Sequence, residues 1–566
     1  MTMTWGKRRA IVIIALIVLV VFLIWAASKP GVRIASNSVL VMDASGQIEE
    51  QRAPDFFSAL NGTSPVLHDY LDSLDNARTD PRITGLVVRI APLQTGWAKL
   101  EEIRNHLLAF RSSNKPSICY LGYDGIQNQE YYLASACQQV WLVPTTPVSI
   151  RGMMAEATFV RGTLDKLKIV PEYYHIAEFK TAGNMFTEKK FTPAHKEEVE
   201  SLLRSVYEQY LGDTSKARGM SRDQFEAILN RGPLSSADAL SGKIVDRVGY
   251  WDQIQDYFKK RGSGWNPVSL NSYRTTLGAP NFALDKIAIV YASGLIVSGD
   301  SGTTAAGGFI LGGDSVAADI RRARMDSSIK AIVLRVDSGG GSVVGSEVIR
   351  REVELAHEVK PIVVSMSDVA ASGGYWIASP ADKIVADPNT ITGSIGVIIG
   401  KLNVSGLFNL LGVSTDYVAT SDNATLFSAQ QNFTSEQREY IEKSLHETYD
   451  DFIKGVAAGR KMPVDAVDKI GKGRVWSGSQ AKGLGLVDEL GGVDRAIEVA
   501  KHLAHIPASN SVRLVRLPEE KTFFQQLFER EKEQMSQSES LQATLQHILG
   551  LMEPVQARLP YELHIK

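Results

Sequence analysis

The sequence predicts an α/β fold, formed by two tandem copies of one domain and preceded by a single N-terminal transmembrane helix. Three observations support this prediction. Short apolar, β-branched runs alternate with helical segments, several segments of the first half recur in the second, and one long apolar run near the N-terminus lacks any charge. Alternating strands and helices are typical of βαβ units, in which helices cover a largely parallel sheet.

The composition is that of a folded globular protein. The 566 residues include 61 Lys plus Arg and 63 Asp plus Glu, which gives a formal net charge of -2 at pH 7. Hydrophobic residues make up 44% and charged residues 22%, which excludes a mostly disordered chain and a multi-span membrane protein. Because charges of both signs are interspersed, we expect no nucleic acid partner.

The N-terminus predicts a membrane anchor. Residues 10–27 (AIVIIALIVLVVFLIWAA) form an uncharged run whose helical length of about 27 Å is close to the hydrocarbon thickness of a bilayer. Lys7, Arg8 and Arg9 precede this run, so the positive-inside rule places residues 1–9 in the cytoplasm. The alternative is a cleaved secretory signal. In both cases the body of the chain is exported.

That body contains an internal repeat. Residues 85–90 (GLVVRI) match residues 331–336 (AIVLRV), and residues 131–135 (YYLAS) match residues 375–379 (YWIAS), at a spacing of about 245 residues. Because the matching segments follow one another in the same order, they indicate a duplication.

Two features of the sequence set the predicted domain boundaries. They are a linker-like composition near residues 262–267 and a polar helical pattern after residue 518. The predicted organisation is a cytoplasmic N-terminus (1–9), a signal anchor (10–27), a first repeat (30–262), a linker (263–285), a second repeat (286–518) and a polar helical tail (519–566).

The second repeat carries a candidate nucleophile. Residues 367–376 (SDVAASGGYW) predict a strand that passes through a turn of small residues into a helix, with Ser372 at the turn. The N–H of Gly373 can then face a developing oxyanion, and the preceding loop can bring a second N–H from Gly340 or Gly341. Such a site is suited to acyl transfer. The alternative is a tight turn in which Ser372 only caps a helix.

The first repeat lacks these small residues. Asn128 stands where the second repeat has Ser372, and the segment that matches the glycine loop reads PLQTG (residues 92–96). This asymmetry indicates one active repeat and one repeat that retains only a scaffolding role.

A serine nucleophile needs a base. None of the ten histidines stands in a motif that connects it with Ser372. Lys180, in residues 177–183 (AEFKTAG), has small and aromatic neighbours, and the matching residues 418–424 contain no lysine. Burial of a lysine lowers its pKa, so that a neutral amine can act as a base.

Other chemistry lacks support in the sequence. No H-E-x-x-H zinc helix or P-loop lysine motif is present, so we expect no metal and no cofactor. Cys119 and Cys137 are too few for a disulfide scaffold or a four-thiolate zinc site. We expect both to be core residues rather than a bridge.

Four motifs together resemble a known family. They are AASGGYW (370–376), TGSIG (392–396), SGGGS (338–342) and FKTA (179–182), and they occur in a duplicated chain with one N-terminal anchor. The chain is similar to the long, double-domain form of the signal peptide peptidase A (protease IV) family. This resemblance implies a ClpP/crotonase-like fold and a serine endopeptidase that degrades cleaved signal peptides and other hydrophobic peptides.

The resemblance also implies roles for individual residues. Ser372 would be the nucleophile, Lys180 the general base, and Ser394 the hydroxyl that orients the lysine amine. Gly373, with Gly340 or Gly341, would form the oxyanion hole.

Partners and location follow from the same resemblance. It implies peptide substrates, a homotetramer, and a single-pass protein of the bacterial inner membrane whose catalytic body lies in the periplasm and whose residues 10–27 contact lipid. One alternative is a catalytically inactive, membrane-anchored scaffold of the same fold. Another is an enzyme acting on acyl-CoA thioesters, which export disfavours because CoA is cytosolic.

Overall fold

The computed structural model describes residues 33–52, 64–262, 264–277, 283–304, 308–519, 556–558 and 564–565. The predicted cytoplasmic N-terminus (1–9) and anchor (10–27) lie outside these residues, as does most of the predicted tail (519–566). Within the described ranges, no helix has both the length and the apolar character that crossing a membrane requires.

The first repeat contains a parallel sheet with the strand order β7-β4-β3-β2-β1-β8. Its strands are β1 (Ser38–Gly46), β2 (Ile83–Leu93), β3 (Ser117–Leu121), β4 (Gln139–Leu142), β7 (Arg247–Val248) and β8 (Asn266–Ser269). Strand β2 is an almost continuous buried run, the pattern of a strand that is covered by helices on both faces.

The second repeat contains the same strand order, β20-β16-β15-β13-β9-β21, extended at β15 by β17 and β19. Its strands are β9 (Lys286–Ser293), β13 (Ile329–Ser338), β15 (Ile362–Ala371), β16 (Lys383–Ala386), β17 (Ile391–Gly393), β19 (Val475–Ser477), β20 (Glu489–Leu490) and β21 (Arg513–Leu517). All pairs are parallel except β17 with β19. The predicted α/β class with largely parallel sheets is confirmed.

A third sheet joins the two repeats, in the order β11-β12-β10-β14-β22-β18-β6. Its strands are β6 (Val170–His175), β10 (Leu295–Val297), β11 (Gly302–Thr303), β12 (Phe309–Gly312), β14 (Gly340–Ser342), β18 (Ile398–Asn403) and β22 (Gln556–Arg558), and a separate pair is formed by β5 (Ala155–Glu156) and β23 (His564–Ile565). Strand β6 of the first repeat pairs antiparallel with β18 of the second. Local sequence patterns did not predict this pairing.

Helices cover the sheets of both repeats. The first repeat has α3 (Leu67–Thr79), α4 (Trp97–Arg111), α5 (Asn128–Ala134), α6 (Arg161–Lys166), η1 (Thr181–Gly183), α7 (Asn184–Thr187), α8 (Pro193–Arg218), α9 (Arg222–Leu229), α10 (Ser236–Ser241), α11 (Trp251–Lys260) and α12 (Leu270–Arg274). The second has α13 (Gly313–Met325), α14 (Val343–His357), α15 (Gly373–Ala378), α16 (Ser405–Leu410), η2 (Asp422–Thr425), α17 (Ser435–Arg460), α18 (Val464–Ile470), α19 (Gly478–Gly483) and α20 (Val493–Leu503).

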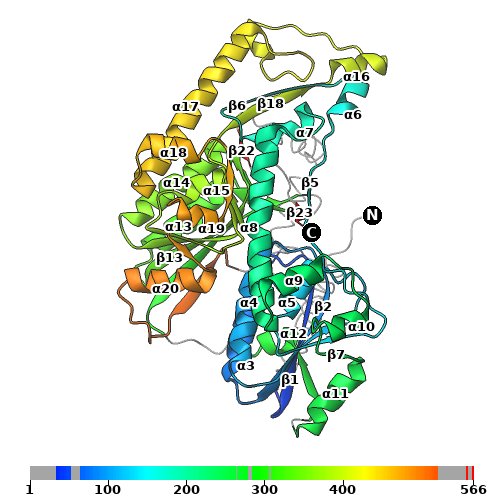
Figure 1. The fold of residues 1–566 in the computed structure, drawn as a ribbon. Coiled ribbons are helices and arrows are strands. Elements are labelled where there is room, and N and C mark those ends of the chain that lie inside the picture. The colour runs from blue at the N-terminus through cyan, green and yellow to red at the C-terminus, as the bar shows by residue number, and fades with distance from the viewer. Residues whose placement is uncertain are drawn as a thin grey trace, which may run out of the picture.

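Helices α8 and α17 are the matching long helices of the two repeats, with 26 residues each. Each begins after a threonine, Thr192 or Thr434, whose side chain accepts a backbone N–H of the first turn. Helix α8 runs along the boundary between the repeats (Figure 1) and contacts β19 of the second repeat. Each repeat has its own main hydrophobic core.

The predicted linker (263–285) is wrong in part. Residues Asn266–Ser269 form β8, which extends the first sheet by pairing in parallel with β1, and α12 follows directly. The Gly, Asn and Pro residues of this segment suggested a linker, whereas the pairing with β1 places the segment in the first repeat.

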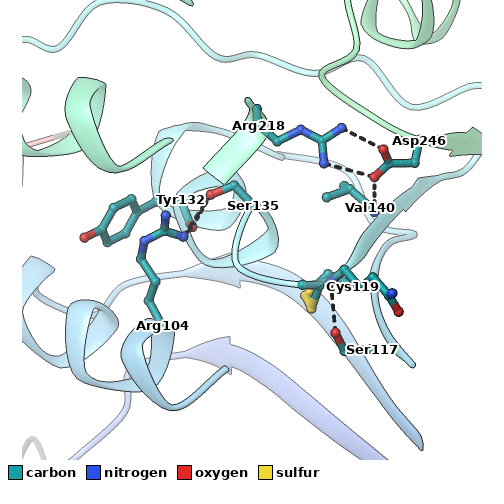
Figure 2. The surroundings of a disulfide bond; sticks show 10 residues. Arg104, Ser117, Cys119, Tyr132, Ser135, Val140, Arg218 and Asp246 are labelled. Atoms are coloured by element: carbon teal, nitrogen blue, oxygen red, sulfur yellow. Dashed lines mark hydrogen bonds and ion pairs between the residues drawn. A yellow bond between two sulfur atoms is a disulfide. The ribbon is translucent and has the colours of Figure 1, made fainter. Parts of the chain in front are cut away.

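The expectation of unbridged cysteines is also wrong. Cys119, on β3, and Cys137, which follows α5, form a disulfide and are fully buried (Figure 2). The fold brings their Cα atoms to 5.7 Å, within the range that a disulfide requires. Their separation of 18 residues along the chain did not indicate this proximity.

Candidate active site

Ser372 lies at the junction of β15 and α15, as the strand-turn-helix pattern predicted. Its backbone is held by two hydrogen bonds, from its N–H to Gly393 O at 2.8 Å and from Trp376 N–H to its own carbonyl at 2.8 Å. The next two residues must be small: a Cβ at Gly373 would lie 2.5 Å from Ser346 Oγ, and one at Gly374 would collide with a backbone carbonyl. Dense packing therefore accounts for the Ser-Gly-Gly sequence.

Lys180, from the first repeat, meets Ser372 across the repeat boundary. Its Nζ lies 2.6 Å from Ser372 Oγ, 3.0 Å from Ser394 Oγ and 3.1 Å from the Ser394 carbonyl oxygen. All three residues are fully buried. The structure thus brings together three of the residues that the sequence singled out.

Burial lowers the pKa of Lys180 well below its usual value, and the nearby carboxylate of Glu198 opposes this shift only in part. Glu198, on α8, accepts the backbone N–H of Val475 at 2.8 Å. This lowering of the pKa favours the neutral amine, the state in which it can accept a proton. Sequence analysis missed Glu198, since a glutamate on a long polar helix gives no sign of being buried.

A glycine of the second repeat packs against the backbone of Lys180. Gly473 has φ +78°, and a Cβ there would lie 2.5 Å from the backbone nitrogen of Lys180. The N–H of Phe179 donates to Lys472 O at 3.2 Å. The second repeat thereby fixes the segment that carries Lys180. Sequence analysis also missed Gly473, although its short Gly-Lys-Gly context (residues 471–473) was a visible signal.

The glycine loop lies beside Gly373. Gly340 and Gly341, in β14, have φ of 95° and 152°, and a Cβ at Gly373 would lie 3.1 Å from Gly340 Cα and 3.3 Å from Gly341 N. In this structure the N–H of Gly340 donates to Ser338 Oγ at 3.1 Å. Gly340 would have to give up this partner in order to bind an oxyanion.

An extended strand already lies along this loop. Strand β22, from the C-terminal segment, pairs antiparallel with β14 through Gly340↔Arg558, Gly341↔Ala557 and Ser342↔Gln556. It also pairs with β18, through Ile398↔Gln556. The space between β14 and β18 therefore accepts an extended backbone.

Asn128, which matches Ser372 in the first repeat, and Lys401, another buried lysine, lie in different surroundings. In the first repeat, Asn128 Oδ1 accepts the backbone N–H of Arg151 at 3.1 Å, a structural contact. Lys401 donates to Leu426 O at 3.0 Å and lies over the ring of Phe433. Among the described residues, Ser372 Oγ hydrogen-bonds with Lys180 and with the carbonyl oxygen of Gly396, and with no histidine.

A buried serine hydroxyl at a strand-to-helix turn, bonded to a lysine amine and lying beside a glycine loop, is an arrangement typical of serine hydrolases. Comparison with known proteins agrees with this class. The family model "Peptidase family S49" matches residues 109–263 and 354–507.

Several curated relatives match most of the chain. "Serine protease SPPA, chloroplastic" from Arabidopsis thaliana is 34% identical over 497 residues, covering 86% of this chain and 72% of that protein. "Protease 4" from Haemophilus influenzae is 31% identical over 528 residues, covering 88% and 84%. "Protease 4" from Salmonella typhi is 35% identical over 458 residues, covering 78% and 72%. The chain belongs to peptidase family S49 and is a serine protease, which confirms the resemblance to signal peptide peptidase A.

Proposed function

We propose that the chain is an endopeptidase that cleaves extended peptides with a Ser/Lys dyad, in which Ser372 is the nucleophile and Lys180 is the general base. The observation that carries this proposal is the 2.6 Å contact between Lys180 Nζ and Ser372 Oγ inside a fully buried site.

The two oxygens of Ser394 explain how the amine is aimed. A neutral amine has two N–H donors and one lone pair. When the hydroxyl and the carbonyl oxygen of Ser394 accept the two N–H groups, at 3.0 and 3.1 Å, the lone pair is left for the hydroxyl proton of Ser372. Ser394 is thus proposed to orient the base, as the resemblance implied.

The proposed reaction has two stages. Ser372 Oγ transfers its proton to Lys180 and bonds to the peptide carbonyl carbon, and the N–H of Gly373, with that of Gly340 or Gly341, binds the developing oxyanion. The C–N bond then breaks, and the amine leaving group takes the proton from Lys180. In the second stage Lys180 takes a proton from water, whose oxygen bonds to the acyl carbon. The ester bond between this carbon and Ser372 Oγ then breaks, Lys180 returns the proton to Ser372 Oγ, and the acid product leaves.

The proposed substrates are cleaved signal peptides and other hydrophobic peptides. The gap between β14 and β18, which β22 occupies as a strand, supports an extended substrate conformation, because a peptide can add there by strand pairing. The proposed anchor (10–27) would hold the site near the membrane in which such peptides are left after cleavage.

Location and assembly are part of the same proposal. We place the catalytic body on the periplasmic side of the bacterial inner membrane, and the Cys119–Cys137 disulfide supports an oxidising compartment. The proposed homotetramer rests on the family resemblance, and exposed apolar side chains around α16 and the start of α17 offer a surface that contact between copies would bury. They are Leu410, Leu411, Tyr417, Val418, Phe427 and Tyr440.

The test combines labelling and hydrolysis. The full chain in detergent is incubated with a fluorophosphonate and analysed by mass spectrometry, and hydrolysis of a synthetic hydrophobic signal peptide is measured in parallel. We expect a covalent adduct on Ser372, and a loss of several orders of magnitude in hydrolysis for Ser372→Ala, as nucleophile removal gives in serine proteases. A folded Ser372→Ala chain that still hydrolyses the peptide would contradict the proposal, and a natural chain without adduct or turnover would favour the inactive scaffold.

A further inference from the structure

Lys99 lies in α4 of the first repeat but is buried against the second. Its ammonium contacts two carboxylates across the repeat boundary, at 2.7 Å from Asp337 Oδ2 and 3.3 Å from Asp368 Oδ2. The backbone N–H of Lys99 also donates to Asp368 Oδ1 at 3.0 Å. Only 4% of Lys99 is exposed, so solvent and salt screen this ion cluster little.

The two aspartates stand on the strands that carry the candidate active site. Asp337 is in β13, three residues before Gly340, and Asp368 is in β15, four residues before Ser372. The strand pairing between β13 and β15 is irregular at this level. Besides the ammonium, a bond from the N–H of Val369 to Asp337 Oδ1, at 3.1 Å, connects the two strand ends.

Helix α4 reaches this point because it begins directly against β15. A Cβ at Gly96, the residue before the helix, would collide with the carboxyl group of Asp368. A carboxylate at a helix N-terminus is favoured by the helix dipole. The first turn of α4 therefore sets the position of Lys99 relative to both strands.

Lys99 also balances the charge of this region. Besides Asp337 and Asp368, the carboxyl groups of Glu49 and Glu50 face the cluster, and Glu50 is paired with Arg335. Burial raises the pKa of Asp368 to about 6 even though Lys99 lowers it. Without the ammonium, two largely buried carboxylates would repel each other, so the strand ends would separate or Asp368 would take up a proton.

We infer that Lys99 is a positioning residue, which fixes the ends of β13 and β15 at the spacing that brings the Gly340–Gly341 loop beside Ser372. This inference rests on the proposed role of Ser372 as nucleophile. The first repeat then contributes two lysines to the reaction. Lys180 touches the nucleophile, and Lys99 acts through the backbone of two strands.

The first test is kinetic, on the full chain in detergent with the hydrophobic signal peptide as substrate. Lys99→Met keeps the length of the side chain and removes its charge. Because oxyanion alignment counts most in the transition state, kcat should fall on the order of 10²-fold while KM stays within about twofold. Lys99→Arg keeps a cation between the aspartates and should restore kcat to within about tenfold of the natural chain.

A matched control separates positioning from general docking of the repeats. Arg516, on β21, forms another ion pair across the repeat boundary, at 2.9 Å from Asp72 Oδ2, without contacting either strand end of the site. Arg516→Met should therefore leave kcat unchanged. An equal loss of kcat in Arg516→Met, or an unchanged kcat in Lys99→Met, would overturn the inference.

A second readout does not depend on activity. Hydrogen exchange measured by mass spectrometry should show faster exchange of residues 338–342 and 369–373 in Lys99→Met, and unchanged exchange there in Arg516→Met. Unchanged exchange in Lys99→Met would overturn the inference alone, whereas hydrolysis by Ser372→Ala would overturn the proposed dyad and, with it, the role of Lys99 in positioning a nucleophile. If Lys99→Met does not fold, the nearly isosteric Asp368→Asn carries both measurements, with an expected loss in kcat of about tenfold.

Discussion

The backbone at Ser372 has φ 57° and ψ −117°, a conformation that costs a non-glycine residue about 1 to 3 kcal/mol. Its surroundings maintain it, because its N–H and carbonyl groups are both bonded and the two following glycines are packed against backbone. The hydroxyl is therefore aimed at Lys180 before any substrate arrives. Strain of this kind at a proposed nucleophile is a form of preorganisation.

The identity of the proposed base can be tested by charge and shape. Lys180→Arg should be almost as inactive as Lys180→Ala, with losses of several orders of magnitude, because a guanidinium does not give up its proton in a protein. Peptide hydrolysis by the purified variants is the measurement. Replacement of each histidine should change the rate little, and one histidine variant as inactive as Lys180→Ala would transfer the role of base to that histidine.

The lowered pKa of Lys180 also predicts a cost in stability. The unfolded chain protonates this lysine below the ordinary pKa of about 10.4, and the folded chain keeps it neutral down to a lower pH. Between these two pKa values folding releases a proton, so the free energy of unfolding rises with pH. At pH values below both pKa values, the free energy of unfolding is smaller by about 1.4 kcal/mol for each pH unit that separates the two pKa values.

Lys180→Met should therefore be more stable than the natural chain at pH 7 to 8, although it is inactive. Urea unfolding at several pH values measures the difference. The advantage of the methionine variant should shrink as the pH rises toward about 10.4. An advantage independent of pH would show that desolvation of the amine is not its source.

At the scale of single elements, the disulfide joins β3 to the turn that follows α5, inside the core of the first repeat. A bridge that closes a loop of this length contributes about 2 to 4 kcal/mol. Cys119→Ser with Cys137→Ser should therefore lower the free energy of unfolding by about that amount. Because the bridge is not in contact with the proposed dyad, we expect kcat at low temperature to stay close to that of the natural chain.

Denaturant unfolding with and without a reducing agent checks this expectation. The natural chain should lose stability on reduction, whereas the double serine variant should not respond. If the double serine variant also lost stability in the reducing agent, the effect of the reducing agent would not come from this disulfide.

The elements that local patterns predicted well are those with local causes. Alternating apolar runs predicted the parallel strands, and the small residues around Ser372 predicted a strand-to-helix turn. Strand β8 was missed because its place in the sheet depends on β1, far away in the sequence. The pairing of β6 with β18 and the disulfide were missed for the same reason, since each depends on segments that only the fold brings together.

In the candidate site, too, residues with a signal in the sequence were predicted, and residues that depend on distant contacts were not. Ser372 and Lys180 stood out because the matching positions of the other repeat differ, which one sequence can show when it contains a duplication. Lys99 and Glu198 did not stand out, because they look like ordinary helix surface residues until the other repeat covers them. Apart from the pairing of Lys180 with Ser372, which the family resemblance implied, contacts across the boundary between repeats were thus the least predictable part of the site.

For the whole molecule, the proposed dyad predicts that neither repeat is active alone. Residues 283–566, expressed without the first repeat, should show no peptide hydrolysis, and addition of residues 30–277 should restore some of it. This division keeps β8 and α12 with the sheet to which they belong. Restoration should fail when the added first repeat carries Lys180→Ala. Hydrolysis by the second repeat alone, at the rate of the full chain, would falsify the split dyad.

A site shared between two separate cores also has a consequence during synthesis. The first repeat leaves the ribosome early and has a hydrophobic core of its own, but it does not carry the proposed nucleophile. The serine arrives later, on a domain that must complete its own core and then dock before the amine is within 2.6 Å of it. If the proposed dyad is correct, the growing chain would have no peptidase activity against itself or its neighbours while it is being made.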